Sequence, residues 1–162
     1  MSTSFRPLFI LGLLGCCGLI AGAYYLQYVV GLEPCPLCYV QRIEVFTLGL
    51  IFFIAALHNP AALGRKLYAA GTLVVSALGM ATAGRQMWLQ TLPADELPAC
   101  LPSMDYMIQA FPLIDVINKT LHGTADCAKI DWTFFGFNLA QLSFFSFCLI
   151  ALFSLLLILR KA

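Results

Sequence analysis

Four long apolar runs constrain this chain more than any other feature of its sequence. They cover roughly residues 8–30, 37–57, 67–89 and 139–159, and a helix of about 20 apolar residues crosses a hydrocarbon core. Hydrophobic residues make up 61% of the 162 residues and charged residues only 10%, which lies outside the range of soluble globular proteins. We predict an all-α membrane protein, a single domain over residues 1–162, folded as a bundle of four transmembrane helices.

The second run spans a membrane only if its polar first turn is counted. Its purely apolar part, roughly residues 45–57, has the length of a re-entrant segment, and Gln41, Arg42 and Glu44 precede it. We count this turn as part of the span because the resulting topology places a majority of the cations on one side of the membrane. A four-span topology places five cations on one side, namely Arg6, Arg65, Lys66, Arg160 and Lys161, and four on the other, namely Arg42, Arg85, Lys119 and Lys129.

The orientation follows from this distribution of cations. Cations are enriched in cytoplasmic loops, and those in long loops carry less weight. Two of the four cations on the minority side, Lys119 and Lys129, lie in a long loop. We therefore expect a multi-pass membrane protein with both termini in the cytoplasm and two loops on the outer side, roughly residues 31–36 and 90–138.

The first run also resembles a secretory signal peptide. Arg6 precedes it, and Ala21-Gly22-Ala23 is similar to a small-residue cleavage site. Three tyrosines favour a retained helix, because aromatic side chains gather where a transmembrane helix meets the interface. These are Tyr24, Tyr25 and Tyr28. We expect the first span to be retained.

A Cys-X-X-Cys pair, Cys35 and Cys38, lies at the start of the second run, with Arg42 four residues after Cys38. In a helix, Cys38 would occupy the first turn, where free N–H groups and the positive end of the helix dipole favour a thiolate. Arg42 would share a face with Cys38, and its charge would stabilise the thiolate further. This arrangement indicates redox chemistry.

A structural disulfide and a metal site are the alternatives for this pair. A zinc site needs a second closely spaced pair or nearby histidines, but Cys100 and Cys127 are far apart in sequence and His122 is isolated. A c-type haem needs His directly after the second cysteine, and Tyr39 stands there. We predict no metal.

The cysteines divide into a loop group and a membrane group. Cys35, Cys38, Cys100 and Cys127 lie in the outer loops, one pair per loop, and an oxidising compartment suits two disulfides. A Cys100–Cys127 bond could also be purely structural, because closing such a loop gains about 3 to 4 kcal/mol. The membrane group comprises Cys16, Cys17 and Cys148, which we interpret as packing residues.

Two further patterns bear on the fold. Small residues at helical spacing in the first and third runs predict close helix approach; they are Gly12, Gly15, Gly18, Gly22, Gly71, Ser76, Gly79 and Ala83. In the long loop, apolar residues at helical spacing end at Pro112 and predict a short amphipathic helix, either on the membrane surface or packed on protein; they are Met104, Met107, Ile108 and Phe111.

The chain as a whole resembles the DsbB family of disulfide-generating inner-membrane proteins. The features that carry this resemblance are the four spans, the segment Cys35-Pro36-Leu37-Cys38, Arg42 after it, and the second outer cysteine pair. The segment from Cys127 to Gly136 is similar to the run that follows that family's last loop cysteine. The resemblance covers essentially the whole chain. It implies a protein-dithiol:quinone oxidoreductase.

The resemblance further implies a relay. A periplasmic DsbA-like thiol oxidase, in its reduced form, attacks the Cys100–Cys127 disulfide at Cys100, and Cys127 then attacks Cys35 of the Cys35–Cys38 disulfide. Cys38 leaves as a thiolate beside Arg42 and passes two electrons to a quinone, ubiquinone or menaquinone, from the membrane pool. Cys38 is also the deeper cysteine in the second helix, so we expect it to be the one that meets a lipid-soluble acceptor.

The outer end of the third run departs from the pattern of some family members. The segment Ala83-Gly84-Arg85-Gln86-Met87 has no histidine to bind a quinone carbonyl. We expect Gln86 or Arg85 to substitute, with the alternative that both only anchor a helix end at the interface.

Two other functions fit the sequence less well. One is a relative of the vitamin K epoxide reductases, which couple Cys-X-X-Cys to a quinone with the electrons running in the other direction. The other is a non-enzymatic scaffold with loop disulfides, which would need neither Arg42 nor a proline between the cysteines. The net charge of +1 argues against a nucleic-acid partner, and the lipid bilayer is the expected surrounding.

Overall fold

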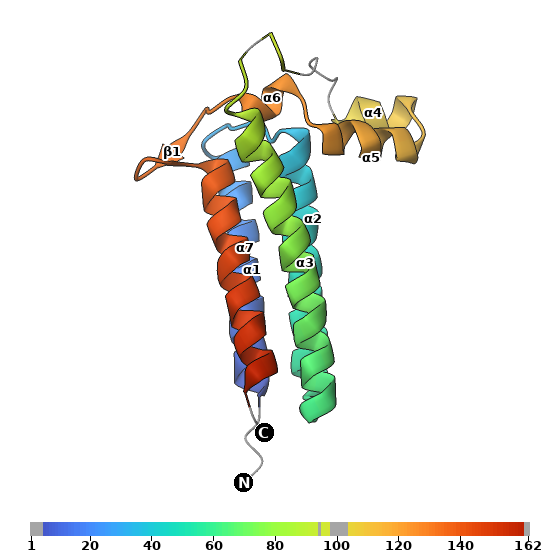
Figure 1. The fold of residues 1–162 in the computed structure, drawn as a ribbon, viewed down its shortest axis with the longest axis vertical. Coiled ribbons are helices and arrows are strands. Elements are labelled where there is room, and N and C mark those ends of the chain that lie inside the picture. Colours follow the sequence, from blue (N-terminus) through green and yellow to red (C-terminus); the bar gives the residue numbers. More distant parts are fainter. Residues whose placement is uncertain (1–4, 94, 98–103, 161–162) are drawn as a thin grey trace.

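The computed structural model describes residues 5–93, 95–97 and 104–160. Its long helices are α1 (Arg6–Tyr28), α2 (Pro36–His58), α3 (Ala62–Leu89) and α7 (Leu139–Leu159). The remaining elements lie between α3 and α7: α4 (Met104–Ala110), α5 (Leu113–His122), α6 (Ala125–Ala128), β1 (Thr133–Phe134) and β2 (Phe137–Asn138). In Figure 1 the long helices run side by side and the short elements gather at one end of them.

The predicted fold class is confirmed. Each of the four long helices is long and apolar enough to cross a membrane, and they coincide with the four predicted runs. The third helix begins earlier than expected, at Ala62, two residues after Pro60. Proline is disfavoured inside a helix and common just before one begins. The polar turn with Gln41, Arg42 and Glu44 lies within α2, so the second run is a full span.

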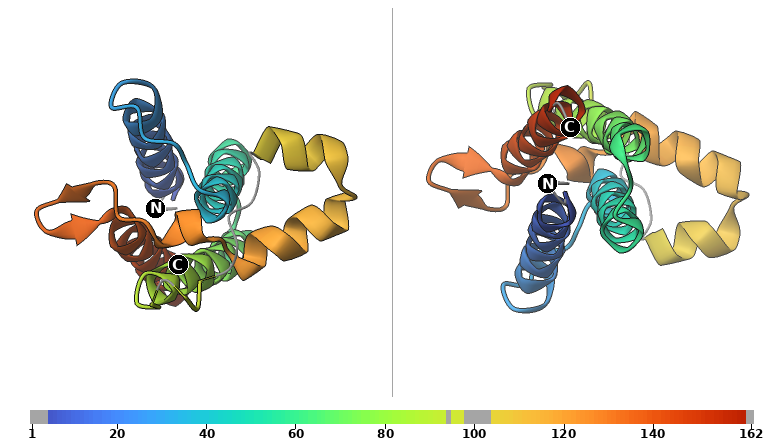
Figure 2. Two further views of the ribbon diagram at one scale, coloured as in Figure 1. Left: turned by 90° about the horizontal axis from the view of Figure 1, so that it is seen from above. Right: turned by 90° about the horizontal axis from the view of Figure 1, so that it is seen from below.

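The bundle is built around α3, which packs along both α2 and α7, while α1 packs on α2. Figure 2, seen along the bundle, shows α1 beside α2 and diagonally across the bundle from α3. The core between the helices contains Phe9, Leu48, Phe52 and Phe147. These four side chains are fully or almost fully buried.

Only some of the small residues at helical spacing in the first and third runs allow close packing of the helices. A Cβ at Gly79 would lie 2.3 Å from the ring of Phe147, and one at Gly12 would lie 2.9 Å from Phe52. No atom outside the local helix lies within 4 Å of a Cβ built at Gly15, Gly18, Gly22 or Gly71. The prediction of close packing is therefore wrong at these four positions.

The long loop contains the predicted short helix and a second one. Pro112 ends the first, α4, and is the N-cap residue of α5. On α5, Ile114, Ile117 and Leu121 are exposed at helical spacing, which makes this helix amphipathic. Figures 1 and 2 show α4 and α5 projecting sideways from the end of the bundle. Whether they lie on a membrane surface stays a prediction.

A short hairpin leads from the loop into α7. Thr133 pairs with Asn138 and Phe134 with Phe137, and the turn residues Phe135 and Gly136 both have positive φ, 50° and 85°, as tight hairpin turns require. Asn138 then caps α7 through a capping box and also binds Gln90 at the end of α3, 2.8 Å away. These contacts anchor the base of the hairpin at the ends of α3 and α7.

Candidate redox site

Cys35 and Cys38 lie where α2 begins. Cys35 is the N-cap residue, Pro36 is the first helical residue, and Cys38 lies in the first turn as predicted. Proline suits this position because its fixed φ is helical and the N–H it lacks would be unpaired anyway. The two sulfur atoms are 3.0 Å apart. The pair is therefore held at the end of a helix, with Cys38 on the membrane side.

Cys127 from the second loop reaches this pair. It lies in α6, is fully buried, and packs in a cluster with Leu37 and Leu89 against which Cys35 also rests. Gly123, with φ of 79°, permits the approach, since a Cβ there would lie 2.3 Å from Leu89. The structure thus brings together three of the four predicted loop cysteines. Cys100, and with it the predicted Cys100–Cys127 disulfide, lies outside the described residues.

The thiols of Cys35 and Cys127 influence each other's ionisation. A side-chain hydrogen bond with Cys35 lowers the pKa of the Cys127 thiol, and backbone N–H groups add to this effect. The pKa of Cys35 is raised, chiefly because it hydrogen-bonds Cys127 and then Cys38, and because it is buried. Cys127 is therefore the more readily ionised of these two, and Cys35 serves as donor.

Arg42 shares a cavity wall with Cys38, as its spacing predicted, but its hydrogen bonds go to α1. Its Nη1 donates to the side chain of Gln27 on α1, and its Nη2 donates to the carbonyl of Ala23, 3.2 Å away. The rings of Tyr24 and Tyr39 lie 5.4 Å and 5.7 Å from the guanidinium carbon. Within the described part of the chain, no hydrogen bond joins Arg42 to Cys38. The guanidinium is instead fixed between α1 and α2.

Gln86 on α3 faces the cysteine pair. Its Nε2 lies 3.6 Å from the sulfur of Cys35 and 3.6 Å from that of Cys38. Its Oε1 accepts a hydrogen bond of 2.8 Å from Gln41 on α2. Both glutamines are almost completely buried. The other candidate at this helix end, Arg85, donates to the carbonyl of His122 and stacks on Trp88.

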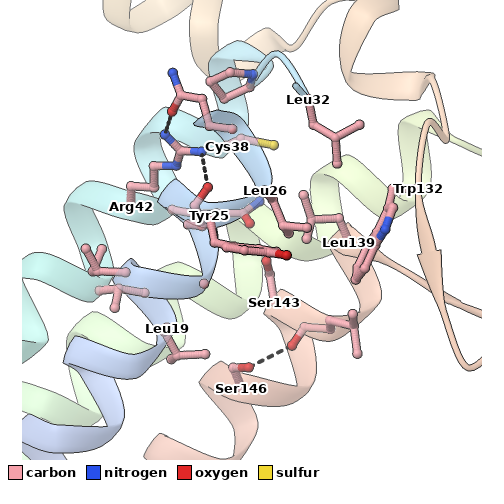
Figure 3. A pocket seen from close by; sticks show the side chains of 18 of the residues that line it. Leu19, Tyr25, Leu26, Leu32, Cys38, Arg42, Trp132, Leu139, Ser143 and Ser146 are labelled. Carbon is pink, nitrogen blue, oxygen red and sulfur yellow. Dashed lines mark hydrogen bonds between the residues drawn. The ribbon is translucent and has the colours of Figure 1, made fainter. Parts of the chain in front are cut away.

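A cavity of about 470 Å³ opens beside Cys38, between α1, α2 and α7 (Figure 3). Its walls are largely apolar, and Gly18 and Gly22 line it on α1. Arg42 contributes a charged group, and Trp132 lines the cavity from the segment before the hairpin. Figure 3 shows the sulfur of Cys38 and the ring of Trp132 near the same end of the cavity. Gln86 lines a small crevice on the other side of Cys38.

Three site residues were missed in the sequence. Gln41 entered the sequence analysis only as part of the polar first turn of the second run, and Gln27 was not singled out. A polar side chain within a span is itself a functional signal, and it could have indicated both. Trp132 was recognised only as part of the segment after Cys127. Nothing in its spacing from α1 or α2 indicates that it lines a cavity beside Cys38.

Known proteins resemble this chain along almost its full length. The family model described as "Disulfide bond formation protein DsbB" matches residues 5–157. "Disulfide bond formation protein B 1" of Pseudomonas aeruginosa is 48% identical over 157 residues, covering 97% of this chain and 96% of that protein. "Disulfide bond formation protein B" of Stutzerimonas stutzeri is 47% identical over 156 residues, 96% of each chain.

These matches agree with the four spans and with the cysteines at the end of the bundle. They support a multi-pass membrane protein that forms disulfide bonds, and hence an oxidoreductase. This chain belongs to the DsbB family of disulfide bond formation proteins.

Proposed function

We propose that this protein reoxidises a periplasmic DsbA-like dithiol protein and passes the electrons through its two cysteine pairs to a membrane quinone. One observation carries the proposal. Cys38 lines an apolar cavity and its sulfur lies 3.0 Å from that of Cys35, while Cys35 packs against the buried cluster that contains Cys127. Cysteines from the two loops thus lie together beside an apolar cavity that is suited to a lipid-soluble molecule.

The chain's own cysteines account for the exchange steps. The partner's two thiols reduce the Cys100–Cys127 disulfide and become a disulfide themselves. The thiolate of Cys127 then attacks Cys35, the Cys35–Cys38 bond breaks, and Cys38 leaves as a thiolate. Cys100 next attacks Cys127, which reforms the Cys100–Cys127 disulfide and leaves Cys35 reduced. Two electrons have then moved from the partner to the Cys35–Cys38 pair.

The environment of Cys127 suits the attacking role. Thiol–disulfide exchange proceeds through the thiolate, and hydrogen bonds from Cys35, the Leu37 backbone and Thr124 lower the pKa of Cys127. Cys127 is fully buried in its cluster with Leu37 and Leu89, so the ordered α6 segment holds its sulfur in place. Attack by Cys127 is therefore favoured by both proximity and ionisation.

The size and lining of the cavity support a quinone headgroup as its occupant. Its volume of about 470 Å³ is typical of small-molecule sites, which are mostly apolar with a few placed polar groups. Arg42 would supply the charged donor, while Leu26, Leu142 and Trp132 would supply apolar surface. A bound quinone accepts two electrons and two protons and becomes a quinol. Arg42, fixed by Gln27 and Ala23, would stabilise negative charge on the quinone without having to reorganise.

Identification of the bound quinone tests this proposal. The protein is purified in detergent and extracted with solvent, and the extract is analysed for ubiquinone and menaquinone. We expect about one quinone per chain, with an absorbance that changes when reduced DsbA-like protein is added. A variant in which Trp132→Ala opens the cavity wall should retain less quinone. A protein that binds no quinone, in the extract or on addition, would contradict the proposal.

A further inference from the structure

Gln41 and Gln86 form a buried amide pair between α2 and α3. Both residues lie within membrane-spanning helices. Although their side chains are polar, only 5% of Gln41 and 4% of Gln86 is exposed. A buried amide without hydrogen bonds costs free energy, and each of these has a partner in the other. The Nε2 of Gln41 donates to the Oε1 of Gln86 at 2.8 Å. The pair therefore joins the two helices directly below the cysteines.

The free end of this pair points at the reactive sulfur atoms. With its Oε1 bound by Gln41, Gln86 presents its Nε2 to Cys35 and Cys38, at 3.6 Å from each sulfur. A thiolate accepts hydrogen bonds, and an N–H donor stabilises it relative to the thiol. The thiol form of Cys38 also has a partner, because its sulfur lies 3.9 Å from Oε1 of Gln86. The side-chain amide of Gln86 can thus hydrogen-bond both the thiolate and the thiol of Cys38.

Gln41 determines which end of Gln86 faces the sulfur atoms. An amide side chain can turn by half a rotation and exchange its oxygen and nitrogen. The Gln41 donor holds the oxygen of Gln86 away from Cys35, so the nitrogen faces the pair. Arg42, which the sequence suggested for this task, is occupied by Gln27 and Ala23. The charged group and the sulfur donor are therefore different residues.

We propose that Gln86 is a second hydrogen-bond donor to the Cys38 thiolate, in addition to the thiol of Cys35, and that Gln41 is the residue that positions it. The proposal rests on the proposed redox function of the Cys35–Cys38 pair. When this disulfide is reduced, it gains two electrons and one proton, leaving Cys35 as a thiol and Cys38 as a thiolate. Stabilising that thiolate stabilises the reduced pair. The Cys35–Cys38 disulfide consequently becomes a stronger oxidant of the other cysteines.

The equilibrium of this disulfide with glutathione tests the proposal. The full chain carries Ala at its five other cysteines, so that only Cys35 and Cys38 react, and the reduced fraction is measured across glutathione buffers at fixed pH. Gln86→Leu should make the reduced form about tenfold less favoured, as expected for loss of a hydrogen bond to a charged group. Gln41→Leu removes the donor that holds the Oε1 of Gln86, so the Gln86 amide is free to turn and part of the same loss should appear.

Two further variants separate this role from simple packing. Gln86→His keeps an N–H donor and should recover part of the loss. Gln109→Leu, on the exposed surface of α4, is the matched control and should behave as the parent. A second readout is the pH profile of Cys38 alkylation in a Cys35→Ala chain, whose midpoint should move to higher pH in Gln86→Leu.

The outcomes are distinguishable. An unchanged glutathione equilibrium and alkylation profile in Gln86→Leu would overturn the proposal. It would also be overturned if Gln86→Leu and Gln86→His lost the reduced form equally and both were only less thermally stable, because the donor would then make no difference. If Gln86→Leu shifts both readouts but the parent protein oxidises no partner and binds no quinone, the role of Gln86 stands and the proposed function fails.

Discussion

Arg42 on α2 donates a hydrogen bond to the side chain of Gln27 on α1. This contact places a fixed positive charge in the wall of the cavity, while Cys38 occupies the same wall one helical turn earlier. A guanidinium bound at two points is less free to follow a negative charge than a lysine ammonium. Arg42 is therefore better placed to stabilise a molecule bound in the cavity than to contact the sulfur of Cys38.

Replacing Arg42 should weaken the use of quinone. Arg42→Met removes the charge and both hydrogen bonds, so the apparent affinity for quinone should fall by about tenfold or more, the scale of a lost charge-assisted hydrogen bond. Arg42→Lys keeps the charge but loses the planar fork and should lie between the parent and Arg42→Met. Turnover is measured against quinone concentration for each variant.

Arg85→Met is the control for this series. Arg85 also lies near the outer end of a span, where it donates to His122 and stacks on Trp88, but it does not line the cavity. It should leave the quinone dependence unchanged. Attack of the partner on the second loop should also be unchanged in Arg42→Met. If Arg42→Met matches the parent in its quinone dependence, Arg42 is only an interface anchor.

The four loop cysteines should each be required for turnover. Every exchange step uses both sulfur atoms of a pair, so Ala at Cys35, Cys38, Cys100 or Cys127 should abolish oxidation of a reduced partner. The membrane cysteines lie apart from the site: Cys16 is buried in the bundle core, and the sulfur of Cys148 lies 3.4 Å from that of Met80. Their Ala variants should oxidise the partner normally. Full turnover without Cys100 would disprove the relay.

Cys127 should remain reactive at lower pH than an ordinary cysteine. An unperturbed thiol has a pKa of about 8.5, and the hydrogen bond with Cys35 lowers the pKa of Cys127. As the pH falls below 8.5, ordinary thiols protonate first and Cys127 stays a thiolate until the pH passes its own lower value. Alkylation of Cys127 in the reduced protein, followed by mass spectrometry, gives its pH profile. Cys35→Ala removes the largest cause and should move the midpoint upward; an unmoved midpoint would refute this assignment.

Labelling with an impermeant thiol reagent should reveal the orientation. Lys66 follows the start of α3 and His122 ends α5, at opposite ends of the bundle, and both are exposed. A cysteine introduced at position 122 should react in intact cells, and one at position 66 only after the membrane is opened. Labelling of position 66 from outside would reverse the predicted topology and remove the cysteines from the oxidising side.

The spans and the cysteine pair were predictable because their signals are local. Apolar runs of sufficient length form membrane helices wherever they occur, and Pro36 between Cys35 and Cys38 starts a helix at a known place. The short helix before Pro112 was predictable for the same reason. Each of these depends on neighbouring residues only.

The arrangement of the site depends on contacts between distant residues, which the sequence does not contain. The spacing of Cys38 and Arg42 placed them on one helix face, but Gln27 on α1 binds the guanidinium. Gln86 lies 48 positions from Cys38, and only the packing of α2 on α3 brings them together. Gly18 and Gly22 have the spacing of a packing stripe, and they line a cavity because α1 packs on α2 rather than closely on α7.

The most direct test of the proposed function is the ratio of partner disulfide formed to quinone reduced. Purified protein is mixed without oxygen with an excess of reduced DsbA-like protein and a measured amount of quinone, and both products are followed over time. We predict one disulfide for each quinone reduced, with oxidation ending when the quinone is exhausted and absent in Cys38→Ala. Oxidation of the partner that continues without quinone reduction, or quinone reduction that does not need Cys38, would contradict the proposed electron path.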